Sequence, residues 1–176
     1  CSTAAVNVGQ FDEAMRRELD AGRDILCICF SSALSTTYQS ACIAAEDLRG
    51  EYPDAKIIVI DSLSASRGQG MLLYRAVQER RKNDPDIETL AAYVRGIIQS
   101  QCHWFIVDDL NQLKRGGRVS ATAAFVGTVL GIKPVLHTDS EGRLIPMSKA
   151  RGTKAALTAL VDKVVELGIE PEKNQP

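Results

Sequence analysis

The stretch ILCICFSSALSTTYQSA, residues Ile25 to Ala41, decides the fold. Its first six residues, through Phe30, are all apolar, which is typical of a strand buried on both faces in a parallel sheet. Ser31 to Leu34 follows as a short loop, and Ser35 or Thr36 is placed to cap a helix. The stretch therefore predicts a buried strand that leads directly into a helix.

The same pattern recurs on both sides of this stretch. A second buried strand is predicted at Lys56–Ile60 and ends in Asp61. Helices are predicted around the two strands, at Gln10–Ala21, from the serine cluster to about Arg49, at Gly68–Lys82 and from Asp86 to about Ile98. Strands that alternate with helices across short links predict a parallel sheet with right-handed crossovers.

The pattern changes near residue 100. Strands are expected at Trp104–Val107, Ile132–Thr138 and Arg143–Ser148, and the last two flank the turn sequence DSEG, a hairpin signal. The other segments of this half are the polar stretch Leu110–Arg118, a small-residue helix at Ser120–Leu130 and an amphipathic helix at Gly152–Leu167. We therefore expect an α/β protein of two domains: a parallel one at 1–99 and a mixed or antiparallel one at 100–176.

Composition excludes several classes of protein. The 176 residues carry 21 basic and 22 acidic side chains, a net charge of −1, which argues against a nucleic-acid-binding surface. Hydrophobic residues make up 45% of the chain, as in globular proteins. Since no apolar run reaches the roughly 18–20 residues of a membrane helix, stable membrane insertion is not expected.

The cysteines are expected to be free thiols. There are five, an odd number, and Cys27 and Cys29 alternate within the first strand, so both point to one face. This usage is typical of a reducing compartment and predicts a cytoplasmic protein. The two histidines, His103 and His137, show no metal-ligand spacing, so we expect no metal site.

Two serine-rich loops are the candidate ligand site. SSALSTT, residues 31–37, follows the first buried strand and opens a helix, and DSLSAS, residues 61–66, follows the second. Ligands of open parallel sheets bind at this edge, and a helix N-terminus favours anions. The alternative is that the serines only cap helices and complete loops.

Three classes of function stay open on the residues alone. A serine hydrolase is disfavoured because there is no GxSxG elbow and both histidines fall in or beside predicted strands. A binding protein or enzyme for a small phosphorylated or other anionic metabolite would use the helix N-terminus. A regulatory module would have no small-molecule pocket. The basic segments KRGGR (114–118) and RGTK (151–154) offer arginines to an anionic partner or lie in solvated turns.

Four motifs in order carry a resemblance to a known family. They are CFSSALSTTYQSA (29–41), IIVIDSLSASRGQG (57–70), VDDLNQLKRGGRVSATAAFVGTVLGIKPVL (107–136) and SKARGTKAA (148–156). Their order and spacing, over nearly the whole chain, resemble the DegV family of bacterial fatty-acid-binding proteins.

The resemblance implies a carrier rather than an enzyme. Proteins of the DegV family hold a long-chain fatty acid between two α/β domains, with the acyl chain in an apolar tunnel and the carboxylate bound by hydroxyl groups. They present that carboxylate to a fatty acid kinase of the dihydroxyacetone-kinase type, and the acyl-phosphate feeds phospholipid synthesis. The resemblance thus implies a bound fatty acid, a kinase partner and no further cofactor.

The resemblance also assigns residues. It implies that Thr3 and Ser35 bind the carboxylate, with Ser32 as the second choice in its loop, and that Arg118 and Arg151 serve the kinase step. Val6 and Thr36 depart from the family's proline and glycine. The family pattern also has an upstream strand with a TDS segment and a downstream histidine, so we expect this chain to be part of a longer protein.

Overall fold

The computed structural model describes residues 4–108, 110–119 and 131–168, and the chain divides into two compact units, Cys1–Gln101 and Cys102–Pro176. The elements of the first unit are α1 (Val8–Asp20), β1 (Ile25–Cys29), α2 (Thr37–Glu51), β2 (Ile57–Asp61), α3 (Arg67–Asn83) and α4 (Ile87–Ile98). The strands β1 and β2 pair in parallel, with Cys29 opposite Asp61. The carboxyl ends of both strands therefore meet at one edge.

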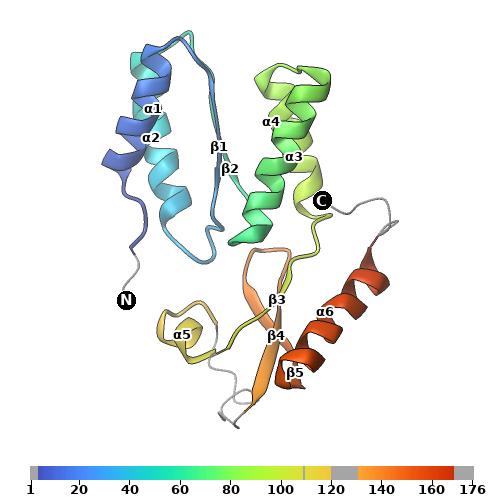
Figure 1. Cartoon of the computed structure of the whole chain (residues 1–176). Helices are drawn as coiled ribbons and strands as arrows, with labels where there is room; N and C mark the ends of the chain where they lie inside the picture. The colour runs from blue at the N-terminus through green and yellow to red at the C-terminus, as the bar shows by residue number, and fades with distance from the viewer. Residues whose placement is uncertain (1–3, 109, 120–130, 169–176) are drawn as a thin grey trace. The chain divides into compact units, whose positions relative to one another are not determined.

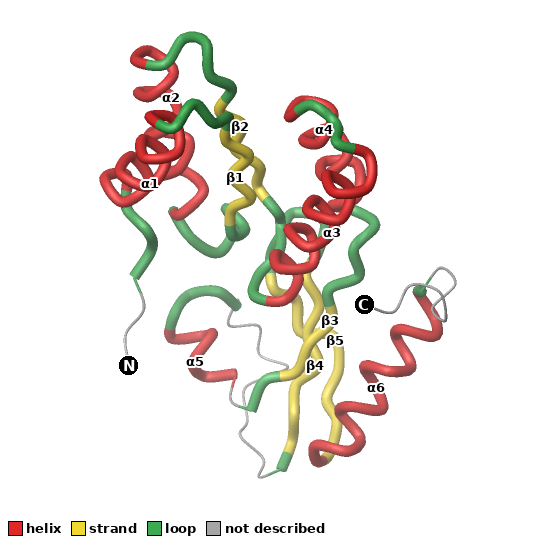
Figure 2. Tube along the Cα trace, turned by 45° about the horizontal axis from the view of Figure 1, so that its top comes forward, coloured by secondary structure: helices red, strands yellow, loops and turns green. Residues whose placement is uncertain are grey.

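The two strands lie between two pairs of helices (Figures 1 and 2). Alternate residues of a strand point to opposite faces, so each strand supplies both cores. The core shared with α1 and α2 is built from Met15, Leu19, Cys29, Ala41, Ala45, Leu48 and Ile57. The core shared with α3 and α4 is built from Ile60, Ala76, Leu90, Ala91 and Val94. Burial on both faces explains the unbroken apolar runs of the sequence.

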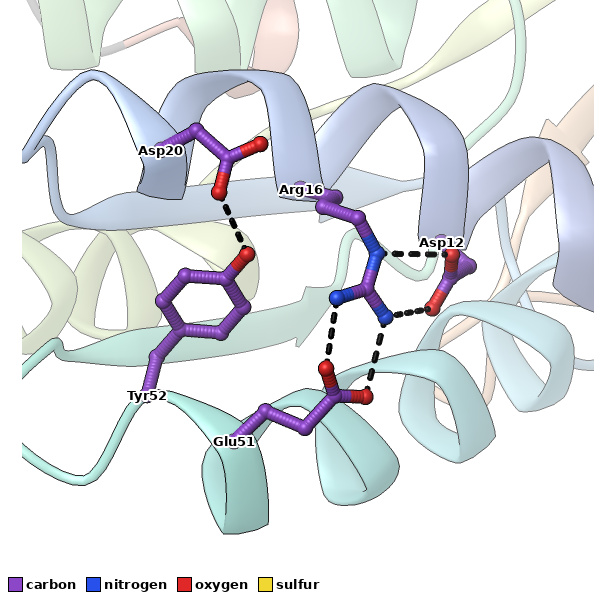
Figure 3. Close-up of polar contacts among 5 residues, drawn as sticks. All are labelled: Asp12, Arg16, Asp20, Glu51 and Tyr52. Atoms are coloured by element: carbon purple, nitrogen blue, oxygen red, sulfur yellow. Dashed lines mark hydrogen bonds and ion pairs between the residues drawn. The ribbon is translucent and has the colours of Figure 1, made fainter.

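A polar cluster joins α1 to the end of α2 on the surface (Figure 3). The Arg16 guanidinium donates two hydrogen bonds to Glu51, at 2.6 and 2.9 Å, and two more to Asp12 on its own helix. The Tyr52 hydroxyl donates to Asp20 at 2.5 Å. This cluster fixes the relative position of the two helices that cover one face of the sheet.

The second unit is an antiparallel sheet with one long helix against it (Figure 1). Its strands β3 (Trp104–Ile106), β4 (Ile132–Thr138) and β5 (Leu144–Arg151) pair in the order β3-β4-β5. The helix α6 (Gly152–Leu167) packs against all three. The predicted α/β class, with a parallel sheet followed by an antiparallel one, is confirmed.

Some elements differ from the predictions in their bounds. The first helix begins at Val8 because the Asn7 side chain and Gln10 cap each other reciprocally, with hydrogen bonds of 3.0 and 3.1 Å. The polar segment before residue 118 contains a short helix, α5 (Leu110–Arg115). The last strand runs on to Arg151, where α6 starts at once.

Candidate functional site

The two serine-rich loops meet where β1 and β2 end. The Ser31 amide donates to the Ser64 carbonyl at 2.9 Å, and the Ser62 amide donates to the Cys29 carbonyl at 3.1 Å. Ser31 and Ser62 have no exposed surface, and Ser64 is 5% exposed. These backbone contacts make the two loops a single structure, which we call the serine edge (residues 31–37 and 61–66).

The Asp61 carboxylate connects the two loops of the serine edge through hydrogen bonds. Its carboxylate accepts hydrogen bonds from the Ser32 amide, at 3.2 and 3.3 Å to the two oxygens, and from the Leu63 amide at 3.0 Å. One carboxylate thus serves both loops. From the sequence, Asp61 is placed at the end of a strand and in the second candidate loop, but its carboxylate is assigned no role of its own. A carboxylate at the last position of a buried parallel strand is the signal that points to that role.

In the second loop, the Ser62 hydroxyl forms hydrogen bonds with the backbone of its own loop. The Ser62 hydroxyl accepts a hydrogen bond from the Ser64 amide at 3.1 Å and donates to the Ser64 carbonyl at 3.2 Å. Leu63 and Ser66 have φ values of 48° and 49°. Such positive φ values in residues other than glycine cost about 1–3 kcal/mol each and persist where the surroundings enforce them. The second loop is therefore a rigid support for the first.

Ser35 and Thr37 form a pair of hydroxyl groups at the start of α2. Their Oγ and Oγ1 atoms lie 2.8 Å apart, and the Ser35 hydroxyl also accepts a hydrogen bond from the Thr37 amide at 3.2 Å. Thr36 occupies the N-cap position, but its side chain makes no capping hydrogen bond. Both hydroxyl groups are half-buried at the positive end of a 15-residue helix, where an anion is favoured.

Ser32 differs from Ser35 in its setting. It is exposed, and the structure holds it through its backbone amide, which donates to Asp61. Its neighbour Leu34 is buried, and the Leu34 amide donates to the Ser31 carbonyl at 3.1 Å. The fold of the first loop thus leaves the Ser32 side chain at the surface, whereas Ser35 is partly enclosed.

Of the remaining predicted site residues, the structure describes Arg118 and Arg151, which belong to the second unit. Thr3 and the predicted helix at 120–130 fall outside the described residues. Arg118 is exposed in the second unit, directly after the turn that ends α5, and its guanidinium donates to the Gly116 carbonyl. Arg151 is also exposed and occupies the N-cap position of α6. The serine edge belongs to the first unit.

Two cavities of the first unit lie away from the serine edge. One of about 470 Å³ lies at the amino end of β1, among charged side chains and the prolyl turn before α4. Another of about 330 Å³ runs along β2 beside α2, with Tyr38, Cys42, Arg49 and Arg95 among its lining. Both mix charged and apolar side chains.

The part of the chain that the structure describes contains neither a metal-binding cluster nor a membrane-spanning helix. Within residues 4–108, 110–119 and 131–168, no group of three or more His, Cys, Asp or Glu side chains could hold a metal ion. None of the helices in these ranges is long and apolar enough to cross a membrane.

A two-unit α/β chain with a serine edge at the end of its parallel strands defines a class of protein with known relatives. The family model described as "Uncharacterised protein, DegV family" matches residues 1–175. A DegV domain-containing protein of Clostridium perfringens is 41% identical over 172 residues, which are 98% of this chain and 59% of that protein. The chain therefore belongs to the DegV family, and it spans about three fifths of the length of the relatives it matches.

Solved structures share the fold. A DegV family protein from Eubacterium eligens, loaded with heptadecanoic acid, matches with a TM-score of 0.84 and 28% identity over 96% of this chain and 59% of its own. The Streptococcus pneumoniae fatty acid kinase B3 protein, loaded with linoleic acid, matches with a TM-score of 0.81. Its 24% identity, over 94% of this chain and 57% of its own, shows a shared fold.

Proposed function

We propose that the protein binds a long-chain fatty acid and holds the carboxylate with hydroxyl groups of Ser35 and Thr3. Ser32, in the same loop, is the second choice for the role given to Ser35. The observation that carries the proposal is the hydroxyl pair of Ser35 and Thr37, 2.8 Å apart at the positive end of α2. The fatty acid bound by the Eubacterium eligens relative supports the choice of ligand.

The energetics fit such a ligand. Each CH₂ of the acyl chain that leaves water contributes about 0.8 kcal/mol, so the chain supplies most of the affinity. Hydrogen bonds to a charged carboxylate contribute about 1.5–3 kcal/mol each, so the hydroxyl groups fix the position of the head. In this proposal the apolar tail therefore provides the affinity, and the polar head sets the orientation of the ligand.

Lipid extraction tests this binding. The purified chain is extracted with organic solvent, and fatty acids are quantified per mole of protein by mass spectrometry. We expect long-chain fatty acid in the wild type and most of it lost in Thr3→Val/Ser35→Ala. Ser100→Ala, at an exposed position after α4, is the matched control and is expected to keep wild-type occupancy. Equal occupancy in the double variant and the control would exclude the assigned head-group site.

We further propose that the protein is a cytoplasmic carrier that presents the carboxylate to a fatty acid kinase, and that it is not itself the enzyme. The resulting acyl-phosphate would enter phospholipid synthesis. Arg118 and Arg151 are assigned to the kinase step, because phosphoryl transfer needs positive groups near the charge that spreads in the transition state. Both guanidinium groups are on exposed residues, which suits contact with a partner.

A paired assay tests the kinase role. Arg118→Ala and Arg151→Ala are expected to keep fatty acid binding but to lower acyl-phosphate formation when a fatty acid kinase is added, most strongly when combined. Arg143→Ala, an exposed arginine of the same unit that pairs with Glu141, is the control. Wild-type phosphorylation by both variants would overturn the partner role, while loss of bound fatty acid would place these arginines at the head group instead.

A further inference from the structure

Two thiols of β1 lie side by side. Cys27 and Cys29 are two residues apart on one strand, so both project from the face covered by α1 and α2. Their Sγ atoms are 3.5 Å apart. Cys29 is buried, at 3% exposure, whereas Cys27 is partly exposed. The pair therefore combines a residue that keeps some exposed surface, Cys27, with a buried one, Cys29.

The spacing suits a bridging atom better than a disulfide. Residues i and i+2 of a strand are about 6.6 Å apart along its axis, and their Cβ atoms project in parallel. A disulfide needs Cβ atoms about 3.5–4.5 Å apart, so a direct bond would bend β1. In contrast, a tetrahedral or pyramidal centre with two bonds of about 2.3 Å to sulfur holds the sulfurs about 3.5–3.8 Å apart.

The two thiols also differ in acidity. The two thiols share a hydrogen bond in which either sulfur can be the donor, and this bond lowers the pKa of Cys27. The same bond, together with burial, raises the pKa of Cys29. Since the thiolate is the nucleophile, the thiol with the lowered pKa, that of Cys27, is the better nucleophile of the two. Cys27 is thus placed to react first and Cys29 to complete a second bond.

We propose that Cys27 and Cys29 form a dithiol site that chelates a monosubstituted trivalent arsenical through both sulfur atoms. With an arsenoxide, R–As=O, two S–H bonds break, two As–S bonds form and one water leaves, with no change in oxidation state. The organic substituent occupies the third bond of arsenic, so two protein sulfurs suffice.

Phenylarsine oxide is the probe that tests the site. The reference chain carries Cys1→Ser/Cys42→Ser/Cys102→Ser, so that the β1 pair supplies its remaining thiols. The matched control adds Cys27→Ser/Ile28→Cys, which keeps two thiols but puts them on opposite faces of β1. Intact-mass spectrometry counts phenylarsine adducts on the folded chain, before and after an excess of 2-mercaptoethanol. Circular dichroism checks that both chains are folded.

The expected result is one adduct per folded reference chain that survives the monothiol and is removed by dithiothreitol. The folded control is expected to retain at least tenfold less adduct, and in urea the two chains are expected to react alike. A second comparison does not depend on the control: Cys27→Ser or Cys29→Ser alone, in the reference chain, is expected to make any adduct labile to the monothiol. A folded reference chain that fails to react, or whose adduct the monothiol removes, overturns the proposal.

Discussion

Replacing Ser35 with alanine removes the hydroxyl group on which the proposed head-group site depends. In the structure this hydroxyl accepts the Thr37 amide at 3.2 Å and lies 2.8 Å from the Thr37 hydroxyl. Its single hydrogen is therefore available either to Thr37 or to a ligand carboxylate. When a ligand binds, the Ser35 oxygen can keep the Thr37 amide while its hydrogen turns to the carboxylate.

The expected loss follows from these contacts. A hydrogen bond to a charged group contributes about 1.5–3 kcal/mol, and a tenfold change in Kd corresponds to about 1.4 kcal/mol. Ser35→Ala should therefore raise the Kd for a fatty acid roughly 10- to 100-fold. Thr37→Val keeps the Ser35 hydroxyl and removes only its neighbour. For Thr37→Val we expect the binding free energy to weaken by about 0.5–1.5 kcal/mol, which raises the Kd roughly tenfold at most.

The assay is displacement of a fluorescent fatty acid by palmitate at fixed pH and salt. Wild type, Ser35→Ala, Thr37→Val and the double variant form a double-mutant cycle, and coupling beyond about 0.5 kcal/mol is expected because the two hydroxyl groups touch. Ser100→Ala controls for the loss of an exposed serine, and thermal melts control for folding. A Kd for Ser35→Ala within twofold of wild type, in a folded protein, would refute the reasoning.

Three further predictions concern stability and the thiols. Leu48 has no exposed surface, so Leu48→Ala should lower the free energy of unfolding by about 2–5 kcal/mol in urea titrations, whereas Leu73→Ala, at a side chain 54% exposed, should change it little. The hydrogen bonds from Arg16 lower the pKa of Glu51, so the stability gained from this pair is present above the ordinary glutamate pKa and is lost as pH falls through the lowered value. The deficit of Glu51→Gln in urea titrations should therefore be larger at pH 7 than at low pH, and a constant deficit would contradict this. Titration of the denatured, non-reduced chain should find five free thiols, and three or fewer would argue against a reducing compartment.

The elements that sequence predicted well are those with a strong periodic pattern. The strand at 132–138 and the helix at 152–167 have the bounds expected for them, because the turn and glycine signals beside them are strong. The parallel pairing of β1 and β2 followed from two apolar runs joined by a helix. The short helix α5 was missed, since six residues span too few turns to give a periodic signal.

The site was less predictable than the fold. Sequence placed both serine loops at one edge, because parallel strands end together, and the loops do lie in contact. It could not assign separate roles to their hydroxyl groups. That Ser62 folds back on its own loop, or that Ser35 faces Thr37, depends on backbone turns which neighbouring residues fix in three dimensions. The assignment of Thr3, Ser32 and Ser35 to a carboxylate stays a prediction.

Asp61 bears on which anion the serine edge can accept. A phosphorylated metabolite at a helix N-terminus is bound chiefly by backbone amides. Here the amides of Ser32 and Leu63 already donate to the Asp61 carboxylate, and the Thr37 amide donates to Ser35. A phosphate bound by the Ser32 and Leu63 amides would have to displace the Asp61 carboxylate and approach its negative charge. A fatty acid carboxylate carries one negative charge, against about 1.5 to 2 on a phosphate monoester, and its tail supplies the affinity. It needs only the hydroxyl groups, so the observed hydrogen bonds favour the fatty acid over the phosphorylated metabolite.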